Sequence, residues 1–144
     1  LQSLQFAKLA CLIELKKLNL SEYAHSVQEN AKIMNKVFTD NNISTYSNDS
    51  KTHIILINTK QFGLSGLESE ELLFKNHILA NKNIVPYDNQ KPEITSGVRL
   101  GTTYITNQNY CKSDIERLTK YIIGILNKKS TTDDFKYFVS KYNN

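Results

Sequence analysis

The sequence predicts an α+β fold in which a small antiparallel or mixed sheet is covered by helices. Two observations lead to this prediction. Apolar residues recur at spacings of three and four along several segments, whereas the β-branched runs are short. These short runs stand between helical segments, in the order helix, helix, strand, strand, helix, strand, strand, helix, helix. That order favours a few strands enclosed by helices over a block of strands that forms its own sandwich.

Two helices are predicted first, over residues 1–18 and from Ser21 to near Asp40. Apolar side chains lie almost all the way round the first helix, which therefore needs cover on several sides. We expect that cover to come from protein outside this chain, and we expect the 144 residues to be a piece of a larger protein. Ser21 is placed to cap the second helix.

Two strands follow, a short one over residues 43–46 and a β-branched one over residues 53–58 with the sequence HIILIN. We expect HIILIN to be a central strand of the sheet. Ser65 and Glu68 stand three residues apart and match a capping box, in which each side chain binds the other residue's backbone N–H. A helix over about 66–76 is therefore predicted.

The second half of the chain supplies further strands and helices. Residues 78–80 suit a brief strand, and residues 97–101, GVRLG, suit an edge or hairpin strand. Ser113 and Glu116 match a second capping box, which opens a helix with one apolar face. A last helix is expected over residues 132–142.

Composition argues against several classes of function. The formal net charge is +4, but the lysines are scattered, so we expect no nucleic-acid partner. No run of eighteen apolar residues exists, so we expect no membrane span. Cys11 and Cys111 lack a paired spacing and are interpreted as reduced, structural residues of a cytoplasmic protein. Because His25, His53 and His77 fall in different predicted elements, no metal or catalytic cluster is expected.

The stretch TSGVRLGTTY, residues 95–104, holds Arg99 between Gly97 and Gly101. Arginine presents a planar fork of donors that pairs with a carboxylate through two parallel hydrogen bonds, which lysine cannot imitate. A glycine two residues to each side lets a strand come close to a ligand. From this chemistry alone, a structural ion pair and a clamp for a substrate carboxylate explain Arg99 equally well.

Residues 81–102, NKNIVPYDNQKPEITSGVRLGT, resemble the signature stretch of the serine hydroxymethyltransferases, which usually ends in Thr-Ser-Gly-Ile-Arg followed by Leu or Ile, Gly and Thr. Residues 52–73, THIILINTKQFGLSGLESEELL, resemble that family's strand and the helix after it. Residues 23–38, YAHSVQENAKIMNKVF, resemble an earlier family helix. The resemblance covers roughly residues 1–126.

This resemblance implies the C-terminal small domain of a fold-type I enzyme that depends on pyridoxal 5'-phosphate and interconverts serine and glycine, with tetrahydrofolate as the one-carbon acceptor. Residues 1–20 would form a helix that links two domains, and residues 21–144 would form the small domain. The large domain, with the Schiff-base lysine and most cofactor contacts, is then absent from this chain, so the fragment alone is expected to be inactive. The parent is expected to be a cytoplasmic homodimer or tetramer.

The family's functional residues transfer to matching positions in this chain. Arg99 matches the arginine that holds the carboxylate of serine or glycine. Asn83 matches an asparagine that faces the pterin of tetrahydrofolate, although a loop cap is the alternative explanation for Asn83. Four residues match positions that shape the arginine strand: Ser96, Gly97, Gly101 and Thr102.

After Thr102 the chain departs from the family pattern. Thr103 replaces a proline, Tyr104 replaces an alanine, and Gln108 and Asn109 replace an Arg-Gly pair. Two alternatives to the hydroxymethyltransferase therefore stay open. One is a divergent pyridoxal-phosphate aldolase or transferase that does not use folate, and the other is a non-catalytic small domain with a binding or regulatory role.

Overall fold

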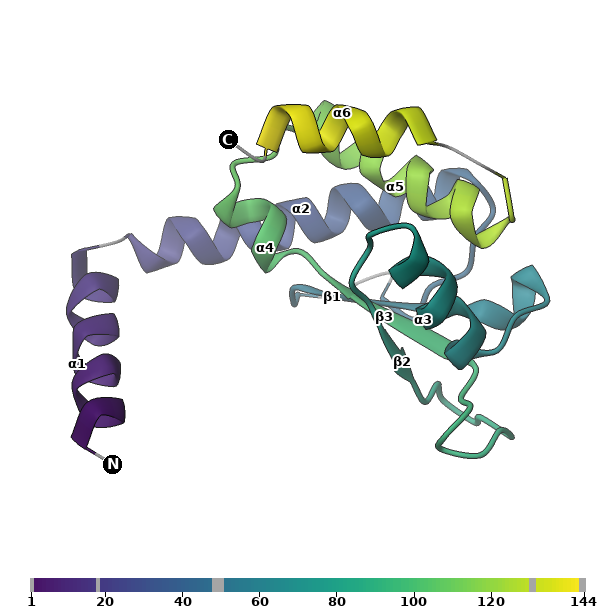
Figure 1. Cartoon of the computed structure of the whole chain (residues 1–144), viewed down its shortest axis with the longest axis horizontal. Helices are drawn as coiled ribbons and strands as arrows, with labels where there is room; N and C mark the ends of the chain where they lie inside the picture. Colours follow the sequence, from purple (N-terminus) through teal and green to yellow (C-terminus); the bar gives the residue numbers. More distant parts are fainter. Residues whose placement is uncertain (1, 18, 48–50, 130–131, 143–144) are drawn as a thin grey trace.

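The computed structural model describes residues 2–17, 19–47, 51–129 and 132–142 (Figure 1). Within these ranges the α+β fold predicted from the sequence is confirmed: helices accompany a three-stranded antiparallel sheet. None of the described helices is long and apolar enough to cross a membrane. The elements in order are α1 (Gln2–Lys17), α2 (Leu20–Asp40), β1 (Ile54–Asn58), the 3-10 helix η1 (Thr59–Phe62), α3 (Gly66–Lys75), β2 (Asn81–Asn83), β3 (Gly97–Gly101), α4 (Thr103–Asn107), α5 (Lys112–Leu126) and α6 (Thr132–Tyr142).

The strand order is β1-β3-β2, so the strand that carries Arg99 is the central one. The sequence-based prediction was wrong on this point, because it placed HIILIN in the centre and interpreted GVRLG as an edge or hairpin strand. β1 shows an alternating burial pattern, which is typical of a strand with one covered face. At its outer edge, Ile57 forms an isolated antiparallel bridge with Thr45. β3 is flanked by antiparallel partners on both sides.

Two other predicted strands were also wrong. The strand expected over residues 43–46 is reduced to the bridge at Thr45. The strand expected over residues 78–80 lies instead at Asn81–Asn83. The backbone N–H of Ile78 donates to the carbonyl oxygen of Leu73 at 2.9 Å and closes the turn at the end of α3. The extended strand therefore begins only after this turn.

One face of the sheet builds the core. Ile55 and Ile57 of β1, with Val98 and Leu100 of β3, belong to a buried cluster that also contains Phe38 of α2. In Figure 1 helices α2, α5 and α6 lie above the strands. Because side chains alternate along a strand, the residues between these positions point to the opposite side, which we call the open face.

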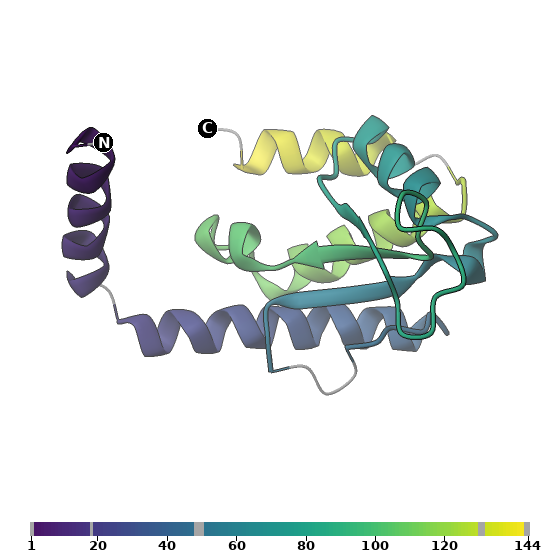
Figure 2. The same cartoon turned by 90° about the horizontal axis from the view of Figure 1, so that it is seen from below.

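Helix α1 stands apart from the body of the domain, at the beginning of α2 (Figure 2). None of its residues is buried. Several large apolar side chains on it are exposed: Leu4, Phe6, Leu9, Leu12 and Ile13. The described part of the chain therefore does not provide the cover that the composition of this helix demands.

The capping box of α3 forms as predicted. The backbone N–H of Ser65 donates to Glu68 Oε2 at 2.7 Å, and the N–H of Glu68 donates to Ser65 Oγ at 3.2 Å. The predicted cap of α2 was wrong: the N-cap is Asn19, whose Oδ1 accepts from the N–H of Glu22 at 3.3 Å. Ser21 lies inside the helix, which begins at Leu20. Asn19 also carries a side-chain oxygen that can accept from the backbone N–H three residues later, and it occupies the cap position two residues before Ser21.

The capping box predicted at Ser113 does not form. Helix α5 begins at Lys112 with Cys111 as its N-cap and without a side-chain cap. Cys111 Sγ instead lies 2.8 Å from Asp114 Oδ2. Both cysteines of the chain, Cys11 and Cys111, are free, as expected, and they are exposed, so neither belongs to the buried core.

Candidate active site

Arg99 lies in the middle of the central strand and points away from the core. Its neighbours Val98 and Leu100 are buried, whereas Arg99 is exposed on the open face. Arg99 forms no ion pair or side-chain hydrogen bond with any residue that the structure describes. The sequence left two explanations for Arg99 open, a structural ion pair and a clamp for a substrate carboxylate. Within the described ranges no residue forms the ion pair that the first explanation requires.

The register of the sheet determines the neighbours of Arg99 on the open face. Arg99 is paired with Leu56 of β1 on one side and with Asn81 of β2 on the other. Gly97 is paired with Asn83 in the same way. Because directly paired residues share a face, Asn81, Asn83 and Arg99 lie on one side of the sheet. The fold thus brings the two predicted ligand-binding residues, Arg99 and Asn83, to adjacent strands and one surface.

Asn83 has its own local contact. Its side-chain Nδ2 donates to the carbonyl oxygen of Ile84 at 2.8 Å, which is the loop-capping contact considered from the sequence. The side-chain oxygen of Asn83 makes no hydrogen bond with the described residues, so it is available as an acceptor.

Gly97 is required where β2 and β3 meet. A Cβ atom at this position would overlap Val85 Cγ1 and would lie 2.9 Å from the carbonyl oxygen of Asn83, closer than real Cβ contacts come. Gly101 differs, because its nearest neighbour would be His53 Cδ2 at 3.7 Å, an ordinary contact. Of the two glycines that flank Arg99, only Gly97 is imposed by packing.

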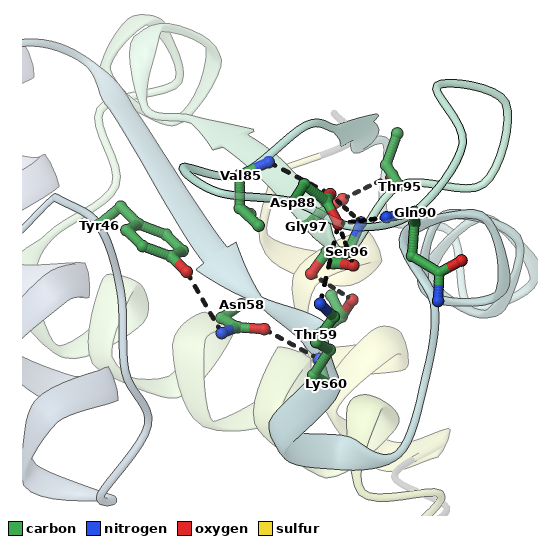
Figure 3. A network of polar contacts seen from close by, with 10 residues as sticks. All are labelled: Tyr46, Asn58, Thr59, Lys60, Val85, Asp88, Gln90, Thr95, Ser96 and Gly97. Carbon is green, nitrogen blue, oxygen red and sulfur yellow. Dashed lines mark hydrogen bonds and ion pairs between the residues drawn. The ribbon is translucent and has the colours of Figure 1, made fainter.

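Asp88 organises the loop that joins β2 to β3 (Figure 3). Its side chain is 1% exposed. One carboxylate oxygen accepts from the Ser96 backbone N–H at 2.7 Å, and the other accepts from the Ser96 hydroxyl at 2.6 Å. The N–H groups of Gln90 at 3.1 Å and Val85 at 3.4 Å also donate to it. A single carboxylate therefore ties the first residues of the loop to its last residue.

The charge of Asp88 is maintained by these contacts. Burial raises the pKa of the Asp88 carboxyl, but the hydrogen bonds from Ser96, Gln90 and Val85 outweigh burial and hold that pKa below its ordinary value. Lys60 Nζ lies 3.8 Å from Asp88 Oδ1 and adds a partly exposed positive charge. Asp88 is therefore ionised at neutral pH and acts as an acceptor for all of its partners.

Sequence reasoning missed the role of Asp88, which it treated only as one position of the signature stretch. The contact with Gln90, two residues later, is an Asx turn, and the sequence contained that signal. The contacts with Ser96 cross eight residues and become visible only in the folded loop.

Both ends of β3 are anchored through buried hydroxyl residues. The carbonyl of Ser96 accepts from the backbone N–H and from the hydroxyl of Thr59, each at 2.9 Å. At the other end, the Thr102 hydroxyl donates to the carbonyl of Val27 in α2 at 3.0 Å. Thr95, immediately before Ser96, is buried with a φ of 58°, an uncommon conformation for a β-branched residue. The contacts of Asp88 and Thr59 with Ser96 hold the chain in this arrangement.

Comparison with known proteins connects this geometry to a family. Residues 5–122, which include the whole open face of the sheet, match the family model described as serine hydroxymethyltransferase. The chain belongs to the serine hydroxymethyltransferase family. The resemblance of residues 81–102 to this family's signature is thereby confirmed.

Two serine hydroxymethyltransferases illustrate the relationship. The chain is 35% identical over 120 residues to the one from Aggregatibacter actinomycetemcomitans and 33% identical over 119 residues to the one from Pelagibacter ubique (strain HTCC1062). Each alignment covers 83% of this chain, but only 29% and 27% of the respective relatives. The chain thus spans less than a third of the length of these serine hydroxymethyltransferases.

The departures from the serine hydroxymethyltransferase pattern lie beyond the sheet. Thr103 and Tyr104 open the short helix α4, which the sequence did not predict, and Gln108 and Asn109 follow its end. Tyr104 is exposed. These four residues therefore lie in the segment that leaves β3 and not on the strand with Arg99.

Other residue classes do not add to the site. Among the described residues, no three His, Cys, Asp or Glu side chains gather in a way that could hold a metal ion. His53 precedes β1 and His77 follows α3, and neither lies on the strands that carry Arg99 and Asn83.

Proposed function

We propose that this chain is the part of a pyridoxal-phosphate-dependent serine hydroxymethyltransferase that binds the carboxylate of serine or glycine. The observation that carries the proposal is the state of Arg99. Its guanidinium is exposed in the centre of the open face, has no partner among the described residues, and lies within the stretch that matches the family. A buried or paired arginine would have supported a structural role instead.

Arg99 orients the substrate. Its planar fork accepts a carboxylate through two parallel, charge-assisted hydrogen bonds, which fix both the position and the rotation of the amino acid. Orientation matters because the bond that breaks must be held in one direction relative to the reacting group. Leu56 and Asn81 are paired with Arg99 across the sheet, and in this proposal they limit the directions from which a carboxylate approaches.

Asn83 contributes to the site of the second substrate. Its amide oxygen is free to accept a hydrogen bond from a pterin ring, while its Nδ2 is held by the carbonyl of Ile84. We assign tetrahydrofolate to this side of the open face, next to the amino acid on Arg99. Tetrahydrofolate would then take the one-carbon unit that leaves serine.

The exposed cation of Arg99 suits a carboxylate, whereas we assign the groups that would hold the phosphate and ring of pyridoxal phosphate to a large domain of the same protein. When bound, the cofactor supplies an electron sink for the bond that breaks at serine Cα. The Thr-Thr-Thr-His context of the family's Schiff-base lysine does not occur in this chain. No lysine here is assigned that role.

The same large domain is proposed to cover α1 and to close over the open face. In this proposal residues 1–20 are the linking helix and residues 21–144 the small domain of a cytoplasmic homodimer or tetramer. The exposed apolar side chains of α1 support this arrangement, because they require cover that the described residues do not provide.

A folate-independent aldolase or transferase is the second candidate, and the substitutions at Thr103, Tyr104, Gln108 and Asn109 favour it. The deciding experiment is to express the gene with any coding sequence upstream of residue 1 included and to assay serine cleavage with and without tetrahydrofolate. Cleavage that requires tetrahydrofolate supports the first proposal. Cleavage without it supports the second candidate, and a protein without either activity would be a non-catalytic small domain.

A further inference from the structure

A cavity of about 550 Å³ lies on the helix side of the sheet, where the end of β3 meets α4, α5 and α6. Its floor includes Leu100 and Ile122 from the core, and its walls include Tyr110 and Phe138. Leu100 and Arg99 are successive residues of a strand and point to opposite faces. The cavity is therefore separate from the candidate active site, and a ligand bound in it would be independent of the role of Arg99.

One wall of the cavity is formed by α6, which begins ten residues after the end of the family match at residue 122. Aromatic stacking holds this helix in place. The rings of Tyr110 and Tyr142 stack with centroids 3.8 Å apart, and those of His77 and Phe135 with centroids 4.1 Å apart. The cavity is thus built jointly by the matched region and by a helix outside it.

A buried carboxylate reinforces this wall. Asp114 of α5, which is 1% exposed, accepts hydrogen bonds from Lys141 Nζ and from the Tyr137 hydroxyl, each at 2.7 Å, and from the Tyr142 hydroxyl. Charge-assisted hydrogen bonds of this kind are strong and directional. They attach the last turns of α6 to α5, so the cavity is formed before any ligand arrives.

Among the residues whose side chains the structure describes, the lining of the cavity carries no Asp, Glu, Lys or Arg. Tyr110 and Tyr142 stay neutral as well. Burial, with smaller effects of Tyr104 and Asp114, raises the pKa of Tyr110, and burial and the hydrogen bond to Asp114 raise the pKa of Tyr142 to about 12. A charged molecule would lose hydration here without meeting an opposite charge in the lining, so the cavity favours a neutral ligand.

A few hydrogen-bonding groups interrupt the apolar surface. The hydroxyls of Tyr104 and Tyr110 and the imidazole of His77 make no hydrogen bond with the described residues. Small-molecule sites commonly combine a mostly apolar lining of this volume with a few polar groups that fix the orientation of the ligand. The free hydroxyls and imidazole can supply that orientation.

We propose that this cavity binds a neutral, planar aromatic molecule that carries a hydroxyl or a ring N–H. A flat ring stacks on or meets edge-on the aromatic side chains of the wall, which a bulky aliphatic ring of the same size cannot do. The polar group of the ligand pairs with a tyrosine hydroxyl or with His77. The site is a property of this chain's own α4, α5 and α6.

The test is an NMR titration of the isotopically labelled chain with p-cresol, a neutral phenol small enough for the cavity. We expect saturable shifts of the methyl groups of Leu79, Ile105 and Leu118, which line it, with a Kd on the order of 1 mM for so small a ligand. The comparison ligand is 4-methylcyclohexanol, which has the same carbon skeleton and hydroxyl but no flat ring. It should bind several times more weakly.

A matched pair of variants makes the test specific. Tyr104 and Phe74 are exposed to a similar extent, 63% and 65%, but only Tyr104 lines the cavity. Tyr104→Ala should weaken p-cresol binding by about two- to tenfold, the usual value of one aromatic contact, and Phe74→Ala should leave it unchanged.

Any one of several outcomes would overturn the proposal. These are the absence of a saturable shift, equal binding of the two ligands, equal effects of the two variants, and shifts that map to the open face or to α1. Resonances of the lining that broaden with protein concentration and do not respond to p-cresol would mean that a second copy of the chain covers the cavity, which also contradicts ligand binding.

Discussion

The carboxylate of Asp88 holds Ser96 by two hydrogen bonds, from the backbone N–H at 2.7 Å and from the hydroxyl at 2.6 Å. Ser96 directly precedes β3, and Asp88 also binds Val85 just after β2. The two strands that carry Asn83 and Arg99 are therefore joined through one carboxylate. Changes at Asp88 should reach the open face even though Asp88 does not lie on it.

Asp88→Asn should destabilise the chain by about 2 to 3 kcal/mol. The amide NH₂ of asparagine is a donor and would face either the backbone N–H or the hydroxyl of Ser96, both of which donate to Asp88, so buried polar groups would be left without a hydrogen bond. Urea unfolding measures this free energy. Asp40→Asn is the control, since Asp40 is 58% exposed and, among the described residues, pairs only with Lys36 on the surface of α2, where the loss should stay below about 0.5 kcal/mol. Similar losses in the two variants would contradict the role assigned to Asp88.

Stability should decrease in acid. In the folded chain the carboxyls of Asp88 and Asp114 both have pKa values below the ordinary value. Burial alone would raise the pKa of Asp114, but this effect is outweighed by the hydrogen bonds that the carboxylate accepts from Cys111, Lys141, Tyr142 and Tyr137. The unfolded chain consequently binds protons that the folded chain does not, starting as the pH falls through about 4. The stabilisation is fully present above that pH and is lost progressively below it.

Urea unfolding between pH 7 and pH 3 measures this dependence. Asp114→Asn removes one of the two carboxyls and should make the free energy of unfolding less dependent on pH over this range. A variant that is less stable at pH 7 but retains the full slope with pH would show that Asp114 does not titrate as described.

Gly97→Ala should be far more disruptive than Gly101→Ala, although both glycines flank Arg99. The added methyl at Gly97 would overlap Val85 and the backbone of Asn83, which costs about 1 to 3 kcal/mol, whereas the methyl at Gly101 has room. Thermal unfolding of the two variants provides the comparison. Equal melting temperatures would contradict the close approach of β2 and β3.

Arg99→Lys should lower the affinity for serine by about ten- to a hundredfold in the active protein that carries this chain, because lysine keeps the charge but loses the planar fork. Folding should barely change, since Arg99 is exposed and has no partner within the described ranges. Serine titration and thermal melting of one preparation measure both quantities.

Arg117→Lys is the matched control, because these are the only two arginines of the chain. Arg117 lies 3.8 Å over the ring of Tyr137, away from the open face, so its replacement should leave serine affinity unchanged. If Arg99→Lys lowers the melting temperature and leaves serine binding intact, Arg99 is a structural residue and the proposed function loses its main support.

The 144-residue chain should self-associate through α1, whose apolar side chains are exposed on all sides. Light scattering at several concentrations should show a rising average mass, and Phe6→Glu should reduce it. A monomer at every concentration that binds no hydrophobic dye would contradict this prediction.

The sequence by itself determined the local elements and the family. The Ser65–Glu68 capping box and the apolar spacing of α2 and α5 are patterns between residues three or four apart, so one stretch of chain contains all the information they need. The signature in residues 81–102 identified the family for the same reason, because its residues stand next to each other in the sequence. Where two spacings competed, as for Asn19 and Ser21 at the start of α2, the local pattern was not decisive.

Only the tertiary structure decided which strand is central, which residue holds the β2–β3 loop, and where the aromatic cavity lies. β3 became the central strand because both of its edges found partners, one of them about forty residues away in the chain. Asp88 meets Ser96 only once the β2–β3 loop has folded back on itself, and Asp114 meets Lys141 only after α6 has packed against α5. Such contacts depend on how the whole chain closes its loops and buries its apolar surface, and no spacing between neighbouring residues specifies them.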